Sequence, residues 1–338
     1  MIDSIGPVVT EPLQALSADD ISRIRRCAAT SRVLVVGSLN VDYLLDVDGS
    51  PTDDSTLLVR SSSIAPGGHA GNCASALAQL GVAAALVAAV GADEDGQFLL
   101  DDMRARGVSI EYIRQVANTR SGRVHIPLFR DSHCMLMERG ANEHLGAHDV
   151  SAAFERPWDA VVVFDPSRAA LLAAFESTSC REDSPPIFWT PGGLYARDPL
   201  SGHLLPSCHT LLVNRHEFSS IRPFVNESSR TDLSKEIVLT RGEHGAQLRK
   251  PGSPVLDVAA PHVLVVDPTG AGDTFAAAYV LASLAGLLAP ARLALANHAG
   301  AFAVRAVGAR GAQPTLDELI DAISRATTPS SQLEQEGA

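Results

Sequence analysis

The most informative segment of the chain reads Val265-Val266-Asp267-Pro268-Thr269-Gly270-Ala271-Gly272-Asp273-Thr274-Phe275. A β-rich run from Val263 to Val266 leads into it, and small residues from Ala276 to Ala282 continue beyond it. The sequence therefore predicts a strand, a turn with two glycines, and a helix that begins near Asp273. The first N–H groups of a helix have no partner within it, and together with the helix dipole they form a site for an anion.

Asp273 lies inside this predicted anion site. Gly270 and Gly272 let the backbone approach a phosphate closely, because no Cβ intervenes. A carboxylate in such a place repels phosphate, so its presence needs a reason. One reason is structural, since Asp is a common helix N-cap residue. The other is catalytic, since Asp273 could accept a hydroxyl proton while the N–H groups hold a transferring phosphoryl group.

The composition limits the class of protein. A chain of 338 residues that is 46% hydrophobic can bury a full core, as one large domain or one domain with an appendage. The net charge of −12 argues against nucleic acid as a partner. Five widely spaced cysteines favour reduced thiols. Without a membrane-length apolar run or a signal pattern, we expect a soluble cytoplasmic protein with no membrane partner.

The order of apolar runs predicts the architecture. Val33 to Val36 form a short apolar run typical of a strand buried on both faces. From Asp159 onward, predicted strands and helices alternate, which favours a three-layer, doubly wound α/β fold with a mostly parallel sheet. Residues 43–64 and 120–139, the second with a hairpin turn at 130–133, are expected to form a small separate β-sheet. We assign residues 1–31 to an N-terminal extension, 32–325 to the main domain and 326–338 to a disordered tail.

Several polar residues follow predicted strands or open predicted helices. Asn40 and Asp42 lie at the end of the first strand, where an open α/β sheet binds ligands, although both could simply complete a turn. A second glycine turn, Gly67-Gly68-His69-Ala70-Gly71-Asn72, precedes another alanine-rich helix. His69 is either a polar loop residue or a substrate contact. Asn214 and Glu217 read equally well as an ordinary helix start.

The segment from Val265 to Phe275 resembles the C-terminal signature of the ribokinase-like (PfkB-type) sugar and nucleoside kinases. The other matching motifs, Asn-x-Asp, Gly-Gly-x-x-x-Asn and Asn-x-x-Glu, occur in the right order, and the resemblance spans about residues 32–323. It implies a ribokinase-like fold in which the small sheet is a lid over the sugar and often a homodimer surface. It also implies ATP and Mg²⁺ as cofactors and, in many members, a monovalent cation such as K⁺.

The resemblance assigns roles to particular residues. It makes Asp273 the catalytic base and Gly270, Ala271 and Gly272 the anion hole, and it implies that Glu217 acts on Mg²⁺ through water. The substrate contacts that it implies are Asn40, Asp42, Gly68, His69 and Asn72; the ATP contacts are Asn214, Glu217, Thr240, Gly242, Gly245 and Asn297; the monovalent-cation positions are Asp267 and Thr269. Ribokinases proper carry Lys where this chain has His69, which puts ribose itself in doubt.

Three functions follow from these observations. The leading hypothesis is an ATP-dependent kinase that phosphorylates a hydroxymethyl group of a sugar or sugar-like molecule. A nucleoside kinase of the adenosine type is the alternative within the same chemistry, and the low aromatic content of 5% slightly disfavours it. The third is a catalytically silent sugar- or nucleotide-binding regulator, against which the intact Asp273 counts.

Overall fold

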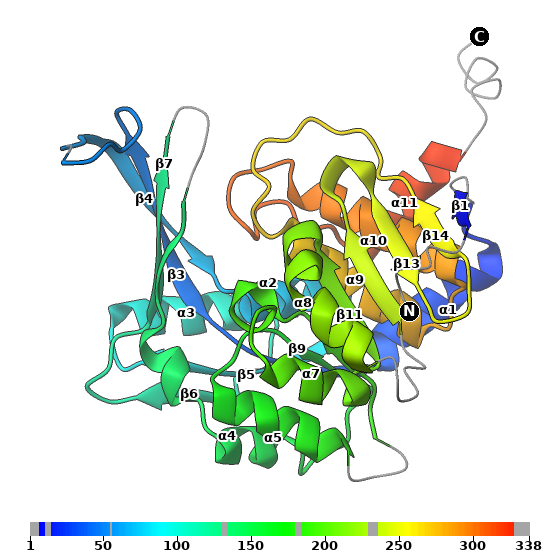
Figure 1. Cartoon of the computed structure of the whole chain (residues 1–338), viewed down its shortest axis with the longest axis horizontal. Helices are drawn as coiled ribbons and strands as arrows, with labels where there is room; N and C mark the ends of the chain where they lie inside the picture. The colour runs from blue at the N-terminus through cyan, green and yellow to red at the C-terminus, as the bar shows by residue number, and fades with distance from the viewer. Residues whose placement is uncertain are drawn as a thin grey trace.

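The computed structural model of the chain describes residues 7–10, 15–54, 56–129, 134–179, 184–228 and 236–327. In these residues a large sheet is covered by helices on both faces, and a smaller sheet projects away from it (Figure 1). The three-layer, doubly wound α/β fold and the separate small sheet predicted from the sequence are both confirmed.

The large sheet is mostly parallel. Among the described residues it has ten strands, and only the pairs β12–β13 and β13–β14 are antiparallel. In spatial order the strands are β1 (Val8–Thr10), β14 (Val255–Val258), β13 (Ala246–Arg249), β12 (Glu236–Thr240), β11 (Thr210–Asn214), β10 (Ile187–Trp189), β9 (Ala160–Val163), β2 (Arg32–Val36), β5 (Ala83–Gly91) and β6 (Ile113–Val116).

Successive residues of β2 face the two opposite helix layers. Val33 and Val35 pack with residues of α2, α9 and α10, whereas Leu34 and Val36 pack with residues of α4, α5 and α8. This alternation follows from the two-residue repeat of a strand, and it explains why the whole run is apolar. The helices are α1 (Ala18–Thr30), α2 (His69–Gln79), α3 (Glu94–Ala105), α4 (Ala147–Ala153), α5 (Arg168–Ser179), α6 (Gly192–Tyr195), α7 (Leu200–Leu204), α8 (Arg215–Ser228), α9 (Ala271–Leu284), α10 (Ala289–Ala303) and α11 (Leu316–Thr327).

Helix α9 is buried along most of its length. Every residue from Asp273 to Ala282 is buried, and the helix packs against both α2 and α10. A helix that is apolar on all sides belongs inside a protein, and its many alanines allow neighbouring helices to approach it closely. The N-terminus of α9 is therefore held in a fixed position.

The small sheet joins two segments that are far apart in the chain. Its order is β4 (Val59–Gly67), β3 (Asn40–Val47), β7 (Gly122–Leu128) and β8 (Leu136–Glu138). Strands β7 and β8 are antiparallel, as a hairpin requires, although its predicted turn at 130–133 lies outside the described residues. The sheet projects beside the main body at the left of Figure 1. We call it the lid sheet below.

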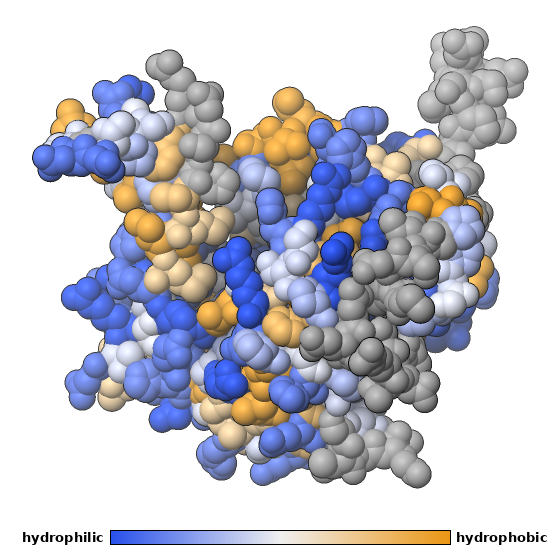
Figure 2. Space-filling view, in the orientation of Figure 1, coloured by the Kyte–Doolittle hydropathy of each residue, from blue (hydrophilic) through white to orange (hydrophobic). Residues whose placement is uncertain are grey.

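One predicted strand is wrong. Residues Val263 to Val266 form no strand, and their exposed fractions range from 40% to 85%. The preceding strand, β14, ends at Val258, and residues 263–266 pair with no strand of the described sheets. The N–H groups of Val266 and Asp267 donate instead to the carbonyl of Val304, at 2.7 and 3.2 Å. Figure 2 shows apolar surface where this loop crosses the top of the view. The β-branched residues indicated a strand, but tertiary context leaves them in a surface loop.

The N-terminal segment contacts the main body in its described part. Strand β1 pairs with β14 in parallel, and α1 buries Ile24 and Ala28 against the core. Ser17 caps α1 in a reciprocal capping box with Asp20. Residues 328–338, most of the predicted tail, lie outside the described residues. Within the described ranges, we find no helix long and apolar enough to span a membrane.

Candidate active site

The glycine turn positions Asp273 inside the first turn of α9. Gly270 is the N-cap residue, with a left-handed φ of +77° that favours glycine, and the helix begins at Ala271. Asp273 is therefore the third residue of the helix and not its cap. Its buried carboxylate accepts hydrogen bonds from Nδ1 of His69 at 3.0 Å and from Nδ2 of Asn72 at 2.8 Å. The interpretation of Asp273 as a helix cap is wrong, because its side-chain partners come from α2.

A first cavity of about 280 Å³ opens beside this carboxylate. All five residues expected to contact substrate line it, namely Asn40, Asp42, Gly68, His69 and Asn72, and Asp273 and Gly270 line it as well. Side chains of the lid sheet form another wall: Val124, Ile126, Met135 and Met137. The structure therefore brings residues from β3, α2 and α9 into one polar pocket with an apolar cover.

Asp42 is a buried carboxylate that faces this cavity. Its exposed fraction is 8%, and burial raises its pKa to about 6, opposed by the positive charges of Arg310 and His69. The backbone leaves room for it only because residue 67 is glycine, since a Cβ there would lie 2.1 Å from Oδ2 of Asp42. A carboxylate that faces a pocket is suited to accept hydrogen bonds from hydroxyl groups.

His69 links the carboxylate of Asp273 to the pocket surface. The negative charge of Asp273 raises the pKa of His69, which favours the imidazolium form. The ring stacks on Phe164, with a centroid distance of 6.1 Å and an interplanar angle of 6°. The side chain remains 52% exposed and is open to the cavity. His69 thus donates to Asp273 and also presents a cationic edge to a ligand.

Asn72 is held between Asp273 and a buried arginine that the sequence analysis missed. Nε of Arg310 donates to Oδ1 of Asn72 at 2.9 Å, and a second guanidinium nitrogen donates to the carbonyl of Gly67 at 2.8 Å. A third forms an ion pair with Asp102 of α3. Because Arg310 can only donate, Oδ1 of Asn72 must face it, and the amide nitrogen must face Asp273. Arg310 lies in the loop from Val307 to Thr315, in which the pair Gly-Ala occurs twice, so the loop matches the family pattern in more than one register. No local signal therefore identified Arg310.

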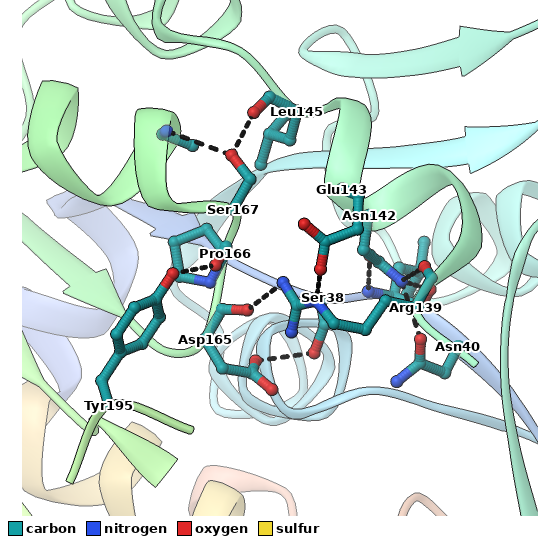
Figure 3. Close-up of polar contacts among 12 residues, drawn as sticks. Ser38, Asn40, Arg139, Asn142, Glu143, Leu145, Asp165, Pro166, Ser167 and Tyr195 are labelled. Atoms are coloured by element: carbon teal, nitrogen blue, oxygen red, sulfur yellow. Dashed lines mark hydrogen bonds and ion pairs between the residues drawn. The ribbon is translucent and has the colours of Figure 1, made fainter. Parts of the chain in front are cut away.

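Two further residues near the substrate pocket were also missed. Asp165 follows β9 and lines the first cavity, and one carboxylate oxygen accepts a hydrogen bond from Ser38 at 2.7 Å. Asn142 lies behind the cavity and hydrogen-bonds to Asn40 at 2.8 Å (Figure 3). Asp165 could have been found, because ligands gather at the carboxyl ends of parallel strands. Asn142 gave no such signal, since it follows a strand of the lid sheet.

A second cavity of about 390 Å³ lies on the other side of the glycine turn. Of the residues expected to contact ATP, Thr240, Gly242, Gly245 and Asn297 line it. The amide nitrogen of Asn297 is engaged, since it donates to the carbonyls of Val258 and Ala259 at 2.9 and 3.2 Å. Asn297 therefore supports the wall of this cavity. The two cavities share four lining residues: Thr240, Pro268, Gly272 and Phe275.

Asn214 and Glu217, two of the residues expected to contact ATP, lie where β11 ends and α8 begins. Both line the first cavity and not the second. They also cap α8 reciprocally, with two backbone-to-side-chain bonds of 2.9 Å, so the interpretation as a helix start is supported too. Burial is the main cause that raises the pKa of Glu217, and the negative charge of Asp273 acts in the same direction.

Asp267 connects the two loops that flank α9. One carboxylate oxygen accepts the N–H of Thr269 at 2.9 Å, and the other accepts the N–H of Gly308 at 2.8 Å. Across the described ranges, no three His, Cys, Asp or Glu side chains gather as metal ligands would.

The fold and the site together define a class. A buried carboxylate beside a helix N-terminus, set between a polar cavity and a second cavity, is the arrangement of a phosphotransferase that acts on a small alcohol. The chain matches the pfkB family of carbohydrate kinases over residues 30–316. The protein belongs to that family and is an ATP-dependent kinase of the sugar or nucleoside class.

Similar proteins agree with this assignment. The chain is 31% identical to a ribokinase of Bacillus subtilis over 294 residues, which cover 86% of this chain and 99% of the relative. It is 32% identical to an ATP-dependent ribose-1-phosphate kinase of Halopiger xanaduensis over 295 residues, 85% of this chain and 96% of the relative. The structure of a Burkholderia thailandensis nucleoside kinase in complex with inosine aligns with a TM-score of 0.76 at 25% identity, covering 87% of this chain and 96% of the other.

Proposed function

We propose that the protein transfers the γ-phosphoryl group of ATP to a hydroxymethyl group of a sugar or sugar-like molecule, with Asp273 as the general base. The observation that carries this proposal is the position of the glycine turn. Gly272 lines both cavities, and Asp273 faces the first one. An acceptor hydroxyl in the first cavity and a nucleotide in the second would meet at this turn.

The reaction would use the groups of the turn as follows. Asp273 accepts the proton of the acceptor hydroxyl, whose oxygen forms a bond to the γ-phosphorus while the bond to the β-phosphate oxygen breaks and ADP leaves. The backbone N–H groups of Gly272 and Asp273 stabilise negative charge on the transferring group, whereas that of Ala271 already donates to the carbonyl of Pro268 at 3.3 Å. His69 and Asn72 hold the carboxylate of Asp273 in one orientation through the bonds described above.

Mg²⁺ is part of the proposal, with Glu217 as the residue that would hold it. Glu217 lines the first cavity near the glycine turn, and burial raises the pKa of its carboxyl group, a penalty that a bound cation would relieve. One carboxylate with water and phosphate oxygens is a sufficient ligand set for this ion. When bound, Mg²⁺ supplies charge neutralisation at the phosphates.

We also propose that Asp267 and Thr269 form a monovalent-cation site. Asp267 already joins the two loops beside α9 through Thr269 and Gly308. A cation such as K⁺ at this carboxylate would strengthen the same connection. Thermal unfolding of the protein without nucleotide, in potassium and in tetramethylammonium salts, tests this. Equal melting temperatures in the two salts would argue against the site.

A nucleoside is the second candidate substrate, and one observation favours it. The apolar lid residues Val124, Ile126, Met135 and Met137 cover a cavity whose floor is polar. A nucleoside presents a polar ribose on one side and a flat base on the other, which fits such a pocket. The similar structure of the Burkholderia thailandensis nucleoside kinase is a complex with inosine.

The lid sheet is a candidate homodimer surface. Several of its apolar side chains are more than half exposed, among them Val59, Ile64 and Leu136. Pairing of two copies through this sheet would bury them. Sedimentation velocity of the wild type against Ile64→Glu, a change on the exposed side of β4, tests this surface. A monomeric wild type would contradict it.

The function is tested by measuring ADP formation from ATP with D-ribose, ribose 1-phosphate, inosine and adenosine as acceptors. With the best acceptor, Asp273→Asn is expected to lower kcat by roughly 10²–10⁴-fold while ATP binding is retained. Asp46→Asn is the matched control, because this exposed aspartate on β3 lines neither cavity. Near-normal turnover of a folded Asp273→Asn variant would exclude the general-base role.

A further inference from the structure

Asn142 is a buried side chain that reaches from one segment of the chain to another. It lies in a short 3-10 helix, η1 (Gly140–His144), directly after lid strand β8, and its exposed fraction is 2%. Its Oδ1 accepts the backbone N–H of Leu39 at 3.0 Å, just before β3 begins. The residue therefore connects the end of the lid hairpin to the strand that carries Asn40 and Asp42 (Figure 3).

The backbone fixes which way the Asn142 amide points. A backbone N–H can only donate, so the atom that faces Leu39 N must be the oxygen. The amide nitrogen then lies near two backbone carbonyls, that of Leu39 at 3.2 Å and that of Arg139 at 3.0 Å. Both can only accept. Three backbone groups therefore assign the positions of the oxygen and the nitrogen in the Asn142 amide.

The orientation of Asn142 in turn fixes Asn40. Nδ2 of Asn142 also lies 2.8 Å from the Asn40 amide, so the Asn40 atom that it meets must be the acceptor Oδ1. The nitrogen of Asn40 is then turned away from Asn142, as Figure 3 shows. Asn40 is 3% exposed and lines the first cavity. Its nitrogen has no hydrogen-bond partner in the part of the chain that the structure describes.

The neighbouring strands are shaped around this pair of amides. Residue 122 of β7 is glycine, and a Cβ there would lie 2.1 Å from Nδ2 of Asn142 and 2.2 Å from Oδ1 of Asn40. Arg139 anchors the same connection from the other side. Its guanidinium donates to the carbonyl of Asp165 at 3.1 Å and pairs with Glu143. Asn142 is thus held in place from both ends.

We propose that Asn142 is a positioning residue that makes Asn40 a hydrogen-bond donor, and only a donor, toward the acceptor substrate. This inference rests on the proposed function. Asn40 and Asp42 lie two residues apart on one face of β3, so the wall offers an N–H donor beside a carboxylate acceptor. The substrate group at Asn40 must therefore accept, as a hydroxyl, ether or carbonyl oxygen does. An ammonium group at that point, as in a protonated amino sugar, is rejected.

A double-mutant cycle tests the coupling between the two asparagines. With the best acceptor from the panel above, Asn142→Ala is expected to raise the KM for that acceptor about tenfold and to leave kcat and the KM for ATP unchanged, the scale of one hydrogen bond. In an Asn40→Ala background the same change should have no further effect, because Asn142 acts through Asn40. Full additivity of the two changes in KM would overturn the proposal.

Ser167→Ala is the matched control. Ser167 is buried in the same region, where it donates to the carbonyl of Leu145 and accepts the N–H of Ala170, but it lines neither cavity. It should lower the melting temperature without changing the KM for the acceptor. An equal rise in KM for Ser167→Ala would mean that general loosening, and not the orientation of Asn40, explains the Asn142 variant.

Asn40→Asp covers the case in which Asn142 variants fail to fold. The new side chain keeps an oxygen toward Asn142 and places a second oxygen where the donor was. We expect the KM for the acceptor to rise at least as much as in Asn40→Ala. Unchanged affinity in Asn40→Asp would show that Asn40 acts as an acceptor, which overturns the assigned orientation.

A readout without catalysis separates this inference from the proposed function. If the wild type phosphorylates none of the four acceptors, the proposed substrate class fails, and crystal structures of the unliganded wild type and of Asn142→Ser still decide the inference. One Asn40 rotamer in the wild type and a different or disordered one in Asn142→Ser support it. The same Asn40 rotamer in both proteins would overturn it.

Discussion

The two cavities that meet at the glycine turn are built by different means. Buried side chains shape the first: Asn72 is fixed by Arg310, Asp42 occupies the space left by Gly67, and His69 pairs with Asp273. The second is lined mainly by small and aliphatic residues, among them Gly242, Gly245, Val263 and Val265, and Asn297 in its wall donates to two backbone carbonyls. A network of polar side chains can distinguish substrates by the positions of their hydroxyl groups. A pocket lined by small and aliphatic residues distinguishes ligands mainly by their shape. The difference is expected for an enzyme whose acceptor must be selected and whose phosphoryl donor is common to many reactions.

The largest loss of stability is expected at Arg310, which supports the wall of the first cavity. Arg310→Met removes a buried guanidinium that bonds to Asn72, Gly67 and Asp102. Breaking a buried ion pair by removing one partner costs about 3–5 kcal/mol, which urea unfolding would measure. Arg106→Met is the control, because Arg106 pairs with the same Asp102 but is 30% exposed. Equal losses for both variants would show that the burial of Arg310 is unimportant.

Asp42→Asn is expected to gain stability and to lose activity. An unfolded aspartate titrates near 3.9, so a folded pKa of about 6 makes the protein lose stability as pH rises from about 4 to about 6. The variant lacks this loss, and near pH 8 it should be more stable by up to about 3 kcal/mol. Its kcat/KM should fall by an amount equivalent to roughly 1–3 kcal/mol, since a partner of the hydroxyls is changed.

The pH profile sharpens the same prediction. Below about pH 6, Asp42 becomes protonated and no longer accepts hydrogen bonds as a carboxylate. The kcat/KM for the acceptor should therefore fall in the wild type as pH decreases through about 6, and this decrease should be missing in Asp42→Asn. Urea unfolding and initial rates across the pH range measure both effects. A variant that is less stable than the wild type near pH 8 would contradict the raised pKa.

Gly245→Ala tests the second cavity at its backbone. Gly245 has a φ of +78°, and a Cβ there would lie 2.1 Å from the carbonyl of Val258. Strain and collision together should cost about 1–3 kcal/mol and raise the KM for ATP, with the acceptor KM unchanged. Gly242→Ala isolates the strain, because φ is +62° there with no atom within 4 Å of the added Cβ. If both variants behave alike, close packing at Gly245 is not what shapes the pocket.

The smallest change in stability is expected in the loop from Val263 to Val266. Leu264 is 85% exposed and lines neither cavity, so Leu264→Ser should change stability by no more than about 0.5 kcal/mol. Val265 lines the second cavity, and Val265→Ser should raise the KM for ATP at similarly small cost in stability. Thermal unfolding and ATP titration of the pair measure this contrast. A strongly destabilised Leu264→Ser would mean that the loop packs against something in solution.

Much of the candidate site could be predicted from local sequence because its motifs are local. A glycine turn followed by an alanine-rich helix gives an anion site wherever it occurs, so Gly270 to Asp273 and Gly68 to Asn72 could be identified from the chain alone. Short apolar runs alternating with helices likewise indicate a doubly wound sheet. The run from Val263 to Val266 misled the same reasoning, since β-propensity reports a fit to a partly buried surface and not the presence of a neighbouring strand.

The sequence by itself determined the fold class, the order of the motifs and the chemical types gathered at the site. Only the tertiary structure decided what those side chains touch. Asp273 is a partner of His69 and Asn72 and not a helix cap, Arg310 fixes one amide, and Asn142 fixes another. The physical reason is distance along the chain: hydrogen bonds act over about 3 Å, and those from Arg310 to Asn72 and from Asn142 to Asn40 join residues 238 and 102 positions apart. No local sequence pattern predicts these contacts, because the packing of the whole core brings the partners together.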